Sequence, residues 1–156
     1  LGDLGSGHVL AGRLSWASQW GRPQDNQKLG VGGRGGIRGA APYTMTGMHR
    51  ISSSLEWRHP YSRNLSINFL RLAWFEGIDG VLFVDSVGLS DNPAGLGNSG
   101  SWSLGVGYGL RFHYLLSGVN PTVIYLDAGI PLALGGHWTL SDTPQGVLLT
   151  GLGQSF

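Results

Sequence analysis

The residues best suited to specific chemistry are a few arginines and carboxylates. Arg38 lies within a glycine-rich run, Gly30–Gly39, and Glu56, Asp85 and Asp127 follow in later segments of the chain. A guanidinium offers a planar fork of N–H donors that fits a carboxylate. Glu56, Asp85 and Asp127 are therefore candidate partners of the two arginines in this run, Arg34 and Arg38.

Other kinds of site find less support in the residues. The glycine-rich run matches G-x-G-x-x-G formally, but no helix is expected after it and it carries no phosphate-binding lysine, so we expect no nucleotide site. His113 on the polar face of an expected strand, with Ser117 in the next turn, leaves open a lipid-hydrolase site. No G-x-S-x-G elbow is present, and we expect no enzyme. The histidines lack ligand spacing, so we expect no metal and no cofactor. They are His8, His49, His59, His113 and His137.

Composition narrows the class of protein. Glycine supplies 28 of the 156 residues and charged residues only 12%, while 41% are hydrophobic and the net charge is +1. Disorder would require lower hydrophobicity and higher net charge, and a near-neutral chain disfavours a nucleic-acid partner. Cysteine is absent, so we expect no disulfide. The sequence contains no apolar stretch of roughly 18 residues, so we expect no membrane-spanning helix. No signal peptide is visible, and we expect a mature or excised piece.

Alternation of apolar and polar residues with period two is the dominant pattern and predicts strands. We expect about six, near His8–Trp20, Arg50–Arg58, Gly80–Ser86, Ser101–Tyr114, Thr122–Ile130 and Gly146–Phe156. The stretch Asn64–Asp79 is ambiguous. Loops rich in Gly, Asn, Pro or Ser are expected at Gly21–His49, Leu89–Gly100 and Gly135–Gln145, with a tight link near Ser117–Pro121.

Two all-β architectures share this pattern, a soluble sandwich or barrel and a transmembrane barrel. The polar faces carry Ser, Gly, Thr and Gln more than Lys and Glu, which favours a crowded barrel interior. Expected strand lengths agree, since a tilted membrane strand needs roughly 9–11 residues. About six strands are too few to close a membrane barrel, whose smallest members have about 8. We therefore expect either further strands or only part of a larger barrel.

Five short motifs follow one another along the chain. They are Gly36-Ile37-Arg38-Gly39, Ser54-Leu55-Glu56-Trp57-Arg58-His59-Pro60, Leu82-Phe83-Val84-Asp85-Ser86-Val87-Gly88, Gly105-Val106-Gly107 leading to Arg111, and Leu126-Asp127-Ala128-Gly129-Ile130-Pro131-Leu132. In this order, and with an aromatic residue at the end, Phe156, the chain resembles the BamA/TamA superfamily, the bacterial surface antigen barrels. There a V/I-R-G-F/Y loop is followed by strands with E-Y/W-R-x-P, F-x-D-x-G and G-x-G-x-R motifs.

The resemblance implies an all-β fold, a transmembrane antiparallel β-barrel of sixteen strands of which residues 1–156 form the C-terminal portion. It implies that the loop at about 21–49 folds into the lumen. The implied conformational contact joins Ile37, Arg38 and Gly39 to Glu56, Phe83 and Asp85, with Asp127 as the rival acid. Leu152 and Phe156 would belong to a C-terminal strand signal. This chain has Ala40 where the family usually has an aromatic residue, which would weaken packing at the loop tip, and Gln154 departs from the terminal pattern.

The implied function is assembly or insertion of outer-membrane proteins, or protein translocation, in a bacterial or organellar outer membrane. Implied partners are outer-membrane lipid, client β-barrel or secreted proteins, the rest of the barrel, and periplasmic POTRA domains or accessory lipoproteins. No nucleic acid is expected. A small outer-membrane lipid-modifying enzyme and a passive pore or structural barrel remain the alternatives.

Overall fold

The computed structural model describes residues 2–3, 7–33, 35–69, 73–138 and 147–153. Strands dominate these residues, and the only helices among them are three short 3-10 turns, η1 (Asp25–Gln27), η2 (Pro93–Gly97) and η3 (Ser99–Ser101). None of the described helices is long and apolar enough to cross a membrane. The all-β class predicted from the sequence is confirmed.

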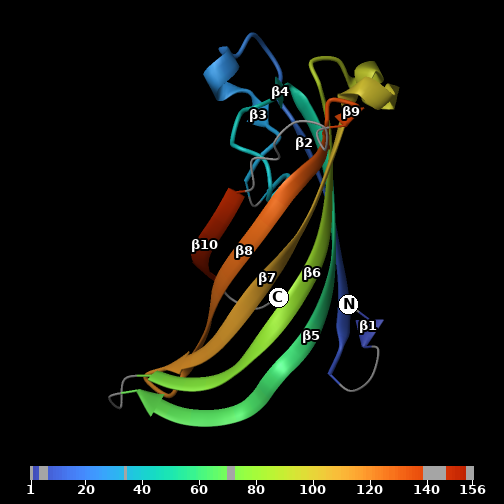
Figure 1. Ribbon diagram of the computed structural model, residues 1–156. Coiled ribbons are helices and arrows are strands. Elements are labelled where there is room, and N and C mark those ends of the chain that lie inside the picture. Colours follow the sequence, from blue (N-terminus) through green and yellow to red (C-terminus); the bar gives the residue numbers. More distant parts are fainter. Residues whose placement is uncertain (1, 4–6, 34, 70–72, 139–146, 154–156) are drawn as a thin grey trace.

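Six strands form the body of one antiparallel sheet (Figure 1). They are β2 (Val9–Ser18), β5 (His49–Phe69), β6 (Ala73–Ser90), β7 (Trp102–Leu116), β8 (Asn120–Leu134) and β10 (Val147–Gly153), in that spatial order. Short strands β1 (Gly2–Asp3) and β9 (His137–Trp138) pair with β2 and β8, and β3 (Leu29–Gly30) pairs with β4 (Thr46–Gly47) in a separate ribbon. Within the described residues the sheet is open, with β10 at one edge and β1 and β2 at the other.

The hairpin of β5 and β6 is longer than the sequence pattern predicts. Within the ambiguous stretch Asn64–Asp79, residues 64–69 form the end of β5 and residues 73–79 form the start of β6. Register shifts occur between Pro60 and Ser62 and between Arg63 and Ile67. The first leaves Tyr61 as an extra residue of β5, and the second sets residues 64–66 of β5 opposite Glu76 of β6. Such irregularities locally disrupt the ladder and the alternation of side chains. Period two is therefore lost here although the strands continue.

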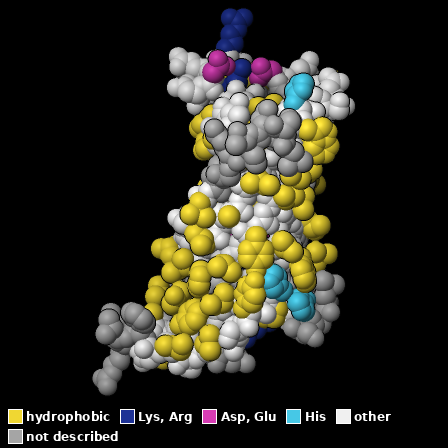
Figure 2. Space-filling model, in the orientation of Figure 1, with side chains coloured by type: hydrophobic (Ala, Val, Ile, Leu, Met, Phe, Trp, Pro, Cys, Tyr) yellow, Lys and Arg dark blue, Asp and Glu magenta, His cyan; other side chains and the backbone are white. Residues whose placement is uncertain are grey.

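The two faces of the sheet differ in chemistry. One face carries an apolar row of directly paired residues that crosses all six long strands: Leu10, Trp57, Leu82, Tyr108, Ala128 and Leu148. We call this side the apolar face. The opposite side carries Ser54, Asp85 and Gly105 as neighbours on successive strands, and we call it the loop face. In Figure 2 hydrophobic side chains cover much of the visible surface between the two ends, whereas the visible charged side chains gather at the upper end.

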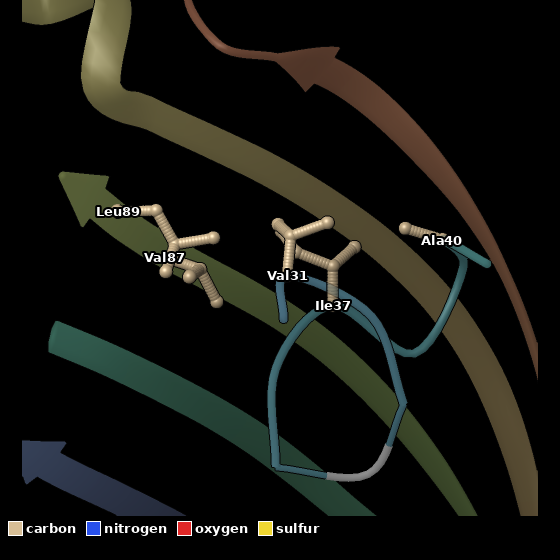
Figure 3. Packing of buried hydrophobic residues seen from close by; sticks show 5 residues of the cluster. All are labelled: Val31, Ile37, Ala40, Val87 and Leu89. Atoms are coloured by element: carbon tan, nitrogen blue, oxygen red, sulfur yellow. The ribbon is translucent and has the colours of Figure 1, made fainter. Parts of the chain in front are cut away.

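The long loop, residues 19–48, connects β2 to β5 and packs against part of the loop face. A small core forms where the loop meets the sheet, from Val31, Ile37 and Ala40 of the loop and Val87 and Leu89 of β6 (Figure 3). Val31 and Ile37 are fully buried. Burying a large aliphatic side chain contributes roughly 1.5–3 kcal/mol, so this core adds an apolar contribution to the attachment of the loop. Ala40, expected to weaken the loop tip, is itself buried in this core.

Candidate functional site

Arg38 reaches the sheet because the loop around it forms tight turns. Ile37 N donates to Val31 O at 2.7 Å, and Gly36 N donates to Gly33 O at 3.0 Å. Ile37 fills the space above Gly105 of β7, where a Cβ would collide with the Ile37 side chain. With Ile37 anchored on β7, the next residue projects its side chain between β5 and β8.

The guanidinium of Arg38 forms a fork with the carboxylate of Asp85 on β6. Arg38 Nε donates to Asp85 Oδ2 and Nη2 donates to Oδ1, both at 2.8 Å. The Arg38 backbone N–H also donates to Oδ2 at 3.1 Å, and Ser54 Oγ donates to Oδ1 at 2.7 Å. The side chains of Arg38 and Asp85 are only 5% and 1% exposed. Asp85 therefore has both oxygens satisfied, and Arg38 is fixed in orientation as well as in position.

Two further acids complete the surroundings of Arg38. Arg38 Nη1 donates to Glu56 Oε1 at 2.6 Å and lies 3.5 Å from Asp127 Oδ2. Asp127 is held more closely by Arg111 of β7, whose Nη1 and Nη2 both donate to it. The distances thus favour Asp85 over its rival Asp127 as the main partner.

Charges in this network balance. Arg58 Nη2 donates to Glu56 Oε2 at 2.8 Å, so that Arg38, Arg58 and Arg111 face three carboxylates. Burial lowers the pKa of the Arg38 guanidinium, but its hydrogen bond to Asp85 and the charges of Asp85 and Glu56 outweigh burial and raise the pKa above its ordinary value. Arg38 is therefore charged at neutral pH.

Phe83 forms a second contact surface for Arg38. The guanidinium carbon lies 3.6 Å from the centroid of the Phe83 ring, as in a cation–π pair. The ring lies against Gly107 of β7, where a Cβ would collide with Phe83 Cζ and with the backbone oxygen of Ala128. The Phe83 ring therefore contacts both the Arg38 guanidinium and the backbone of Gly107.

Gly39 passes directly over the backbone of β8. A Cβ on Gly39 would collide with backbone atoms of Gly129 and Ile130, and a Cβ on Gly129 would lie 2.9 Å from Gly39 N. Both positions therefore need glycine for close approach of two backbones. Gly105 of β7 and Gly129 of β8 therefore allow the loop to pack closely against the sheet.

The structure brings all seven residues of the expected conformational contact together, namely Ile37, Arg38, Gly39, Glu56, Phe83, Asp85 and Asp127. Sequence reasoning missed Arg58, Arg111 and Ser54, which pair with these acids. Leu152 lies on β10 with its side chain 70% exposed, and Phe156 lies outside the described residues.

His113 belongs to a separate cluster on the loop face. Its Nε2 lies 2.9 Å from Asp79 Oδ2, and Arg63 Nε lies 3.4 Å from Asp79 Oδ1. Among the described residues no hydroxyl group is hydrogen-bonded to His113, and no group of His, Asp and Glu side chains is arranged to hold a metal ion. Within the described residues, the carboxylate of Asp79 joins His113 to Arg63.

Asp85 and Asp127 are expected to differ in their effect on the loop. Asp85→Asn removes the charge that faces three Arg38 donors, and we expect trypsin to cleave after Lys28 about tenfold faster, as for loss of a charged hydrogen bond. Asp127→Asn should leave cleavage within about twofold of wild type, because Arg38 keeps its fork. Timed proteolysis of the folded protein measures both rates. Equal cleavage of the two variants would contradict this assignment.

Comparison with known proteins adds no relative. No protein-family model matches the chain, and neither the curated proteins nor the solved structures contain a match.

Proposed function

We propose that this chain is the C-terminal portion of a transmembrane β-barrel whose loop face lines the lumen and whose apolar face meets lipid. Its four longest strands have 21, 18, 15 and 15 residues, more than the roughly 9–11 that a tilted membrane strand needs. The apolar row across the sheet supplies a lipid-facing surface, and the buried charge network requires an interior. The remaining strands of a sixteen-stranded barrel would pair with β10 and with β1 and β2, because unpaired edges are too costly in hydrocarbon.

We infer further that the barrel inserts or translocates other proteins at a bacterial or organellar outer membrane. The observation that carries this inference is the fork between Arg38 and Asp85. A loop that joins β5, β6 and β8 through one arginine fixes the curvature of the wall and thus the direction in which β10 presents its edge.

The proposed chemistry is noncovalent. β10 pairs with β8 from Val147 to Gly153, and no described strand lies along its other edge. Backbone N–H and C=O groups on such an edge can pair with a strand of a client protein. Periplasmic POTRA domains or accessory lipoproteins would deliver that client.

Reconstitution of the full-length protein into liposomes tests this proposal. We expect the liposomes to fold a urea-unfolded outer-membrane barrel client at least about tenfold faster than protein-free liposomes, a barrier change of about 1.4 kcal/mol. Heat-modifiable gel migration of the client measures the rate. Ion conductance without faster folding would instead identify a passive pore. Release of the protein from membranes by alkaline carbonate would contradict the membrane barrel itself.

A further inference from the structure

A polar cluster interrupts the apolar face between β5 and β7. His59 Nε2 lies 3.0 Å from Tyr108 Oη, and Tyr108 Oη is hydrogen-bonded to Tyr61 Oη. The ring of Trp57 lies beside them, with its centroid 5.0 Å from that of His59. Three polar side chains thus form a continuous hydrogen-bonded chain on a face that is otherwise suited to hydrocarbon.

Backbone features of β5 and β6 make this chain possible. His59 and Tyr108 meet across Gly80 of β6, where a Cβ would collide with both Tyr108 Oη and His59 Nε2. The register shift between Pro60 and Ser62 is a bulge at Tyr61. Tyr61 lies two residues after His59 and therefore shares its face of the strand. The cluster depends on a glycine at a defined position of β6.

The tautomer of His59 sets the direction of the hydrogen bonds. His59 Nδ1 is buried and has no hydrogen-bond partner. With the proton on Nε2, His59 donates to Tyr108 and Tyr108 donates to Tyr61, which leaves the Tyr61 hydroxyl proton for another acceptor. Tyr61 is 61% exposed, so in this arrangement its hydroxyl can reach an acceptor outside the chain.

A furrow continues from this cluster across the apolar face. Trp57 and Tyr108 line both the cluster and the furrow. The other lining side chains are almost all aliphatic, among them Leu55, Leu82, Val84, Val106, Ala128 and Ile130. Figure 2 shows the molecule narrowing between its two ends. An apolar furrow with a hydrogen-bond donor at one end matches an amphiphile with one long hydrocarbon chain in the furrow.

We propose that this site binds one glycerophospholipid, with an acyl chain in the furrow and a phosphate or ester oxygen accepting from the Tyr61 hydroxyl. The assignment rests on the proposed membrane orientation, which places the apolar face against lipid. It goes beyond that proposal because it requires a particular lipid molecule to remain bound, whereas a plain apolar wall exchanges lipid freely.

Native mass spectrometry of the full-length protein tests the site. The protein is exchanged into mild detergent with dioleoyl phosphatidylglycerol, and bound lipid is counted. Tyr61→Phe removes the donor and Ala128→Phe fills the furrow, and we expect each to lower lipid retention about tenfold. Tyr43→Phe is the matched control, because Tyr43 is 60% exposed but belongs to the long loop. It should retain lipid as the wild type does.

The outcomes separate this site from the proposed function. Equal retention by all four proteins would show unspecific lipid and overturn the site, even if client folding is still accelerated. Binding that Ala128→Phe leaves intact but inorganic phosphate displaces would show a phosphate site alone and also overturn it. Heat-modifiable migration of each variant shows that the barrel is folded, so a loss of lipid reports on binding.

Discussion

Arg38→Ala is expected to release the long loop from the sheet. The substitution leaves Asp85 buried with its charge uncompensated, and breaking a buried ion pair in this way costs about 3–5 kcal/mol. The loop core at Ile37 alone does not offset such a loss. We expect trypsin to cleave after Lys28 at least tenfold faster than in the wild type, and the protein of the proposed barrel to lose heat-resistant gel migration at a lower temperature.

Two further variants define the role of the arginine. Arg22→Ala, at an exposed position of the same loop, should behave as the wild type. Arg38→Lys keeps the charge but loses the fork, and should fall between wild type and Arg38→Ala. Wild-type cleavage in Arg38→Ala would mean that the charge network does not hold the loop.

Gly39→Ala is expected to have an effect of similar size without any change of charge. Its new Cβ would overlap backbone atoms of Gly129 and Ile130, and backbone cannot move aside as a side chain can. Overpacking of this kind costs typically about 1–3 kcal/mol, and here it also pulls Arg38 away from Asp85. Two measurements test this prediction. They are the temperature at which the protein loses its heat-modifiable gel migration and the rate of tryptic cleavage after Lys28.

Gly35→Ala is the matched control for Gly39→Ala. Gly35 lies in the same loop and is exposed, and a Cβ there would make only an ordinary contact of 3.6 Å with the Arg50 side chain. We expect a change within about 0.5 kcal/mol, as for most surface substitutions. If the two glycine variants behave alike, close packing of the loop against β8 is not what positions Arg38.

The local sequence pattern was sufficient to predict a strand where apolar and polar residues alternate without interruption. β7 shows unbroken alternation, and its expected range, Ser101–Tyr114, differs from the observed strand by no more than two residues at either end. The end of β5 and the start of β6 were not predicted as strands, because register shifts interrupt the alternation there. Alternation with period two reflects the direction of the side chains. A strand with a bulge can therefore lose this sequence pattern while most of its backbone hydrogen bonds remain.

The site was predictable only in part for a related reason. Arg38 and its candidate acids stand out because charges are few in this chain. Arg111 and Asp127 pair across neighbouring strands, and His59 meets Tyr108 across Gly80, two strands away. Such partners depend on the register of the sheet, which no single strand encodes. The sequence does not show which side chains lie over Gly105 and Gly107, and the structure identifies them as Ile37 and Phe83.

Client folding by four proteins in liposomes tests most directly whether the Arg38–Asp85 contact sets the proposed insertion activity. The proteins are the wild type, Arg38→Ala, Asp85→Ala and the double variant. Because the two side chains act through one fork, we expect each single variant to slow client folding at least tenfold and the double variant to be no slower than the worse single one. Wild-type rates in both single variants, or losses that add in the double variant, would contradict the account.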